Sequence, residues 1–301
     1  MLSISKGFYP PQKFFTPLLQ VFCPSFTGFN WYLKSVMELT VLEITALIAL
    51  IPASLLTFRR VPQKDGVYWS ALAVALCGTL AWVYVRQSAG WHTGLSTALW
   101  LTVAACLVLY TGIAYFSEDA WRLTAILFPY LLILGILATI WSQVPESPFI
   151  LGAPLAWIGT HIAVSVATYA LITLAAVAAL AATLQGRAIK AKKRTRLSRL
   201  LPSIAGSEWL LVRLLIASEI ILAIGLVTGI ATLYLSTGQF LTFDHKTTLT
   251  LGVFIIVAGI LFIHFRTGIR GRAATRIVLL AYLLLTLGYP GVKFVTDILL
   301  A

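Results

Sequence analysis

Eight predominantly apolar stretches follow one another along the chain, separated by short polar connections. Their approximate limits are 41–58, 68–86, 95–116, 122–142, 158–184, 209–235, 247–265 and 276–299. A helix of about 20 apolar residues crosses the hydrocarbon core of a bilayer. The connections are too short to hold a separate soluble domain, which needs about 50 residues. The pattern therefore predicts an all-α fold, a polytopic integral membrane protein built as a bundle of about eight transmembrane helices.

The stretch from Trp157 to Leu184 sets the expected orientation in the membrane. Its 28 residues include no Asp, Glu, Lys or Arg, and the segment that follows, GRAIKAKKRTRLSR, carries seven basic side chains and no acidic one. Short basic loops stay on the cytoplasmic side. This helix is therefore expected to run from outside to inside. That direction places His161 near the outer membrane surface, and both chain termini outside.

The net charge of +12, from 22 Lys and Arg against 10 Asp and Glu, raises the question of a nucleic-acid partner. Half of the basic residues, however, lie in two short segments, 187–199 and 266–276, each directly after an apolar run. The positive-inside rule explains that placement better than a polyanion site does. We therefore expect membrane lipid as a partner, anionic lipid included, and no nucleic acid.

Residues 1–36 differ from the rest of the chain. They contain aromatics, prolines and a few basic residues, but neither a sustained apolar run nor the cleavage pattern of a signal peptide. We interpret residues 1–36 as an N-terminal extension. A disordered or interfacial arm would explain it, and so would a start assigned too early, with Met37 as the alternative. Residues 37–301 form the integral membrane domain.

The histidines are the first candidates for chemistry, and the chain has four: His92, His161, His245 and His264. His161 lies near the start of the fifth span and His245 just before the seventh, so we expect the two at similar depth on the outer face. Imidazoles from two helices can bind one haem iron. The alternative is that each histidine is an interfacial residue in contact with water.

Glu219 is the other candidate, because it lies about halfway through the sixth span. An acid at that depth is costly and by default a candidate for function. Proton transfer or a hydrogen bond between helices would each explain it. The cysteines Cys23, Cys77 and Cys106 show no CxxC and no metal-ligand spacing, and no nucleophile–base set is recognisable. We therefore expect no catalytic residue and no metal site, which favours a role other than that of an enzyme.

The C-terminal half resembles the cytochrome c assembly protein family, most closely its small YpjD-like branch. His161 stands in THIAVSVATYALITLAAVAALAA, which is similar to the family's HxxxxxxxYA helix. In this chain, the stretch PSIAGSEWLLVRLLIASEIILAIGLVTG resembles the family's next helix. The stretch DHKTTLTLGVFIIVAGILFIHFRTGIRGRAA resembles the family's DPKETW…HxR…GWxGR segment. The likeness covers about residues 155–299, whereas the N-terminal half matches in topology only.

The resemblance implies haem b handled on the outer face of the bacterial inner membrane during cytochrome c maturation. His161 matches the family's first outer-face haem ligand, and His264 matches its intramembrane ligand. The tryptophan-rich WGxxWxWD loop of the CcsA-type members is replaced here by TGQFLTFDHKTT. The second outer-face histidine has no counterpart, so His245 is the candidate substitute.

The expected function is thus a haem-binding or haem-handling protein that assists cytochrome c maturation together with other maturation proteins. One alternative is a small-solute or ion transporter with Glu219 as its coupling site. That class uses helices broken by Gly or Pro in matching halves, a pattern that the sequence does not show. A second alternative is an accessory subunit of a membrane assembly without a ligand of its own.

Overall fold

The structure is a computed structural model that describes residues 24–59, 63–88, 94–144, 154–192, 195–240, 242, 244–267 and 272–295. Every regular element in these ranges is helical. The chain divides into two units, one reaching to Leu42 and the other running from Glu43 to Ala301. The predicted extension falls mostly outside the described residues, although helix α1 already begins at Pro24. The boundary at Met37 stays a prediction.

Within the described ranges, seven helices are long and apolar enough to cross a bilayer, which confirms the predicted all-α, polytopic membrane fold. The elements are α1 Pro24–Leu55, η1 Leu56–Phe58, α2 Gly66–Ser88, α3 Leu95–Phe116, η2 Ala120–Leu123, α4 Thr124–Ile140, η3 Trp141–Gln143, α5 Leu155–Lys190, α6 Arg196–Leu200, α7 Ile204–Thr237, α8 His245–Thr267, α9 Arg272–Thr286, η4 Leu287–Gly291 and α10 Val292–Phe294. The predicted eighth span corresponds to α9, η4 and α10, which follow one another without a break.

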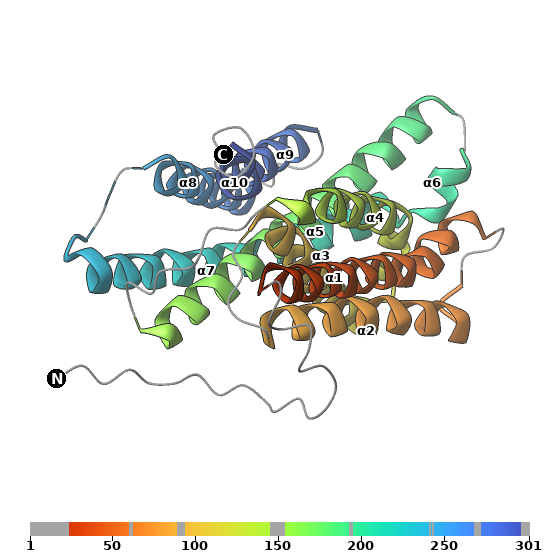
Figure 1. The fold of residues 1–301 in the computed structure, drawn as a ribbon. Coiled ribbons are helices and arrows are strands. Elements are labelled where there is room, and N and C mark those ends of the chain that lie inside the picture. The colour runs from red at the N-terminus through yellow and green to blue at the C-terminus, as the bar shows by residue number, and fades with distance from the viewer. Residues whose placement is uncertain are drawn as a thin grey trace. The chain divides into compact units, whose positions relative to one another are not determined.

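Helix α5 lies at the centre of the second unit. Its most extensive contact is with α7, and α3 and α9 also pack against it (Figure 1). Alanines fill much of its buried length, and small residues let helix backbones approach closely inside a membrane. Gln185 anchors the far end of α5, because its side-chain amide donates hydrogen bonds to the carbonyls of Ser198, Leu201 and Pro202. The pair α5 and α7 therefore has a fixed antiparallel register.

The backbones of helices α1 and α2 approach each other closely at Gly78. A Cβ atom built on Gly78 of α2 would lie 2.5 Å from the Cβ of Ala49 on α1 and 4.0 Å from the Cα of Ala46. That distance is far below ordinary van der Waals contact, so only glycine is compatible with this approach of the two backbones. The crossing of α1 and α2 thus depends on a single missing methyl group.

One end of the helices is rich in basic side chains, and we call it the basic end. The guanidinium of Arg196 in α6 donates a hydrogen bond to the carbonyl of Phe58, and Lys64 donates one to the carbonyl of Tyr115 over 3.4 Å. The carboxylate of Asp119 lies beside Gly206 at the start of α7. These contacts place the end of α1, the end of α3 and the start of α7 together. The predicted alternation of the spans also places these three points on one side of the membrane.

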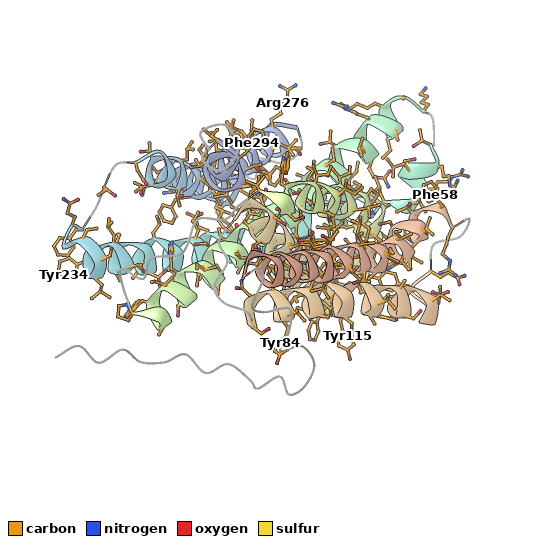
Figure 2. The ribbon with its side chains drawn as sticks, in the orientation of Figure 1. Phe58, Tyr84, Tyr115, Tyr234, Arg276 and Phe294 are labelled. Atoms are coloured by element: carbon orange, nitrogen blue, oxygen red, sulfur yellow. The ribbon has the colours of Figure 1, made fainter. Side chains whose placement is uncertain are left out.

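The last helix changes its winding before it ends. Residues Leu287–Gly291 form a π-helical turn that contains Pro290, and α10 follows it directly. Beyond the turn, the ring of Phe294 meets that of Trp141 edge to face, with the ring centroids 5.4 Å apart. Figure 2 labels Phe294 beside α8 and α9. The widened turn therefore lies just before a contact between the end of the last helix and the turn that follows α4.

Candidate functional site

His161 lies in the second turn of α5, at the end of the helices opposite the basic end. Its ring reaches across to α7, where Nδ1 lies 3.2 Å from the hydroxyl oxygen of Thr228. A Cβ atom built on Gly229 would lie 3.0 Å from Cε1 of the ring. Gly225, one turn earlier on α7, faces Val164 in the same way, at 3.4 Å. Gly229 thus leaves the space that the imidazole fills, and Gly225 leaves room for Val164.

The contacts of Thr228 are compatible with a proton on Nδ1 of His161. The Thr228 hydroxyl lies 3.1 Å from the carbonyl of Gly225, to which it can donate. With its proton placed there, the Thr228 oxygen would accept the Nδ1–H of His161. The imidazole would then have its lone pair on Nε2. Ligating histidines are typically held in this way, through the nitrogen that does not bind the metal.

The surroundings of His161 are those of a membrane boundary rather than of a sealed core. The His161 side chain is half-buried, and Trp157, one turn earlier on α5, is 44% exposed. Trp141 lies at the same end, after α4. Aromatic side chains gather at the levels where a bilayer meets water. The predicted position of His161 near one membrane surface agrees with this setting.

The other histidines do not join His161 among the described side chains. His264 lies in the last turn of α8, half-buried, with its ring 5.6 Å from that of Phe265. The side chain of His245, which begins α8, and the whole of His92 are outside the described residues. The predicted cavity shared by His161 and His245 therefore remains a prediction.

His161 and His264 lie near opposite ends of the helices that carry them, His161 in the second turn of α5 and His264 in the last turn of α8. Tyr169 of α5 is hydrogen-bonded to Thr286 at 3.1 Å, and Gly288 packs on Leu249 of α8. From these contacts His161 is eight residues back along α5, and His264 is fifteen residues further along α8. Neither the hydrogen bond of His161 nor the ring contact of His264 joins the two imidazoles.

Glu219 lies about halfway along α7 and is half-buried. Both carboxyl oxygens are shielded from solvent, and neither has a hydrogen-bond partner among the described residues. An acid in such a place is either neutral or paired with a group that the protein binds. Glu219 lies more than two turns from Thr228 along α7, so it does not touch the His161 contact.

Sequence reasoning did not identify Thr228, Gly225 and Gly229, the α7 residues that hold His161. A signal was present, because Gly225 and Gly229 form a GxxxG pair in an apolar helix, which is typical of close helix packing. Among the described residues, no three His, Cys, Asp or Glu side chains form a group that could hold a metal ion. Among the described side chains at this end, the imidazole of His161 is therefore the candidate ligand.

Two comparisons with known proteins cover this region. Residues 66–300 match the family described as Cytochrome C assembly protein. A protein of Azospirillum brasilense, described as an uncharacterized 28.8 kDa protein in a nifR3-like 5' region, is 51% identical over 265 residues. That match covers 86% of this chain and 98% of the relative. The family match includes α5, α7 and α8, and so every helix that carries His161 or its contacts.

Proposed function

Because this chain belongs to the cytochrome c assembly protein family, we propose that it binds or relays haem b at the end of the helices opposite the basic end. His161 is the axial ligand in this proposal. The protein acts on its own or presents haem to other proteins of cytochrome c maturation. Catalysis by this chain alone is not part of the proposal.

The observation that carries the proposal is the contact between Nδ1 of His161 and the Thr228 hydroxyl, 3.2 Å apart on neighbouring helices. A donor–acceptor chain from Nδ1–H through Thr228 to the carbonyl of Gly225 would leave the Nε2 lone pair for an iron. An imidazole that merely contacts water needs no such partner on a neighbouring helix. Haem, when bound, would supply an iron that a neutral imidazole can ligate. Thr228 of α7 would orient the imidazole, and Gly229 leaves space for it.

Two other histidines are further candidate haem ligands in this proposal. His245 begins α8 and is the candidate for a second ligand on the same iron. His264, in the last turn of α8, would serve a separate haem within the membrane. The tryptophans on this side, Trp141 and Trp157, supply aromatic surface on which a flat porphyrin can pack.

The proposed localisation is the bacterial inner membrane, with the basic end in the cytoplasm and His161 toward the periplasm. The support is the charge of the α5–α7 connection, where Lys190, Lys192, Arg196 and Arg199 are described and no acidic residue occurs. Both termini would then lie in the periplasm.

A topology experiment tests this orientation directly. A reporter that is active only in the cytoplasm, fused after Lys192, is expected to be active, and the same reporter fused after Gly238 is expected to be inactive. A periplasmic reporter should give the opposite pattern. The reverse result would place His161 in the cytoplasm and overturn the proposed outer-face site.

Replacing Thr228 by Val is expected to weaken haem retention about ten- to a hundredfold, the usual cost of losing a partner of a ligating histidine. Valine has nearly the shape of threonine but cannot accept the Nδ1 proton. Thr232→Val is the matched control, because the Thr232 hydroxyl bonds the carbonyl of Thr228 at 2.7 Å and does not touch His161. The measurement is a haem titration of the purified protein. Thr228→Ser should restore binding, and equal loss in both valine variants would refute the orienting role.

An absorbance spectrum of the purified protein separates this function from its rivals. A Soret band at a stoichiometric haem-to-protein ratio is expected. Glu219, with both oxygens shielded and without a partner among the described residues, is the one observation that favours a transporter. A protein without a Soret band, even after reconstitution with haem, would leave the transporter or the accessory subunit as the better reading.

A further inference from the structure

A pocket opens at the basic end of the helices, far from His161. It is an open pocket: its empty space of about 350 Å³ includes open solvent, and η1, α2, η2, α4 and α6 contribute to its walls. The side chains that matter for its chemistry are Leu56, Arg59, Tyr68, Trp121, Arg122 and Leu200. Two guanidinium groups therefore line one open pocket together with aliphatic and aromatic side chains.

The floor of the pocket is held in place by hydroxyl groups. Tyr110 donates a hydrogen bond to the carbonyl of Trp121 at 2.9 Å, and its oxygen lies 2.5 Å from the hydroxyl of Thr124. Tyr68 donates in turn to Tyr110, at 3.1 Å. Because Tyr68, Tyr110 and Thr124 come from α2, α3 and α4, the network ties three helices together beneath the pocket. The pocket therefore has a rigid base.

The first arginine is fixed by a carboxylate. Arg59 donates from both terminal nitrogens to Asp65, at 3.0 and 2.9 Å. The Arg59 guanidinium, together with the backbone N–H of Tyr68, lowers the pKa of Asp65 to about 2, so the pair stays ionised at ordinary pH. A guanidinium has five N–H donors, and two are used here. Arg59 thus keeps donors for a ligand, in a fixed orientation.

The second arginine has no carboxylate partner. The Arg122 guanidinium stacks over Trp121, 5.4 Å from the ring centroid, and within the described residues it forms no ion pair. The nearest acids by sequence do not compensate it. Asp119 is directed toward Gly206 at the start of α7, where a helix N-terminus favours negative charge. A half-buried cation without a counter-ion is a binding site for an anion.

The position of the pocket indicates which anion. Phe58 is 68% exposed and Tyr115 is 67% exposed, both at the basic end, as expected where a bilayer meets water. Figure 2 shows Tyr115 pointing away from the helices. A phosphate group at that depth is most readily supplied by a lipid, whose glycerol and first acyl carbons would meet Leu56 and Leu200.

We propose that this pocket binds the phosphate of an anionic glycerophospholipid through Arg122 and Arg59. Arg122 supplies the uncompensated charge, and Arg59 supplies oriented donors. The apolar side chains on the rim contact the lipid body. Inorganic phosphate shares the anionic chemistry but cannot use these apolar contacts.

The test uses the full-length protein, purified in detergent and stripped of lipid. Phosphatidylglycerol, phosphatidylcholine and inorganic phosphate are added separately, and the thermal midpoint and the lipid retained in native mass spectrometry are measured. Phosphatidylglycerol should raise the midpoint and remain bound, unlike the other two. Equal effects of phosphatidylcholine would refute charge recognition. An equal shift with inorganic phosphate alone would refute the lipid as the source.

Arg122→Gln is expected to weaken retention of phosphatidylglycerol about fivefold, the usual effect of one basic side chain at a membrane surface. Arg213→Gln is the matched control, because Arg213 also stacks on a tryptophan, 3.9 Å from the ring of Trp209, but does not line the pocket. Arg122→Lys keeps the charge and should retain the lipid. Equal loss in both glutamine variants would contradict the proposal. If Arg122→Gln does not accumulate, the lipid comparison on the unmodified protein decides.

Discussion

Replacing His161 by Ala is expected to lower the haem-to-protein ratio at least tenfold. Losing a partner of a ligating histidine already costs ten- to a hundredfold, so losing the ligand should cost no less. The protein level should stay unchanged, because His161 is half-buried and packs on a glycine rather than in an apolar core. The ratio is measured by absorbance in membranes, with protein quantified by immunoblot.

The controls for this experiment come from the same end of the helices. Thr160→Ala changes the exposed neighbour of His161 and should leave the ratio unchanged. His245→Ala should cause a smaller loss, and the double variant should lose little more than His161→Ala, since two ligands on one iron act as a unit. Equal haem in the unmodified protein and His161→Ala, at equal protein level, would remove His161 as a ligand.

Gly78→Ala is expected to destabilise the protein by about 1–3 kcal/mol, the usual cost of an overpacked contact. The added methyl group would lie 2.5 Å from the Cβ of Ala49, so α1 and α2 must move apart. Gly112→Ala is the matched control. Gly112 is also inside an apolar helix, but nothing lies within 4 Å of its added Cβ. There, alanine should be neutral or stabilise by roughly 0.5–1 kcal/mol.

The thermal midpoint of the purified, full-length protein measures both glycine variants. Ala49→Gly in the Gly78→Ala background removes the opposing methyl group and should recover most of the lost stability, as a double-mutant cycle would show. Equal midpoints for Gly78→Ala and Gly112→Ala would mean that the close approach of α1 and α2 does not limit packing.

The spans and their order were predictable because water and hydrocarbon impose a simple length rule. The ends of the helices were less predictable. Helix α5 continues to Lys190, six residues beyond the predicted limit at Leu184, because Gln185 and Arg187 are compatible with a helix and Gln185 bonds α6. Helix α7 begins at Ile204, five residues before the predicted limit, since Ser203 caps it by accepting from the N–H of Gly206. Neither the hydrogen bonds of Gln185 nor the cap at Ser203 can be predicted from hydropathy.

The sequence did not predict which face of each helix packs against its neighbours. Helices that are apolar on all sides carry no periodic signal for the buried face. The contact between His161 and Thr228 joins residues that are 67 positions apart, and it depends on the antiparallel register of α5 and α7. The pocket at the basic end has the same origin, because Arg59 and Arg122 line one pocket only when η1 packs against the start of α4. Residue types could be singled out from the sequence, but their partners could not.

The π-helical turn at Leu287–Gly291 gives the last helix a place where its length can change by one residue. Such a turn holds one residue more than an α-helix of the same rise, as if a single codon had been inserted there. The turn takes up the extra residue locally, so removing one residue would restore regular winding and leave the helix beyond it facing as before. Phe294 would then still face Trp141. A one-residue deletion here is therefore expected to be tolerated better than one elsewhere in the same helix, where it would rotate the following residues by about 100°.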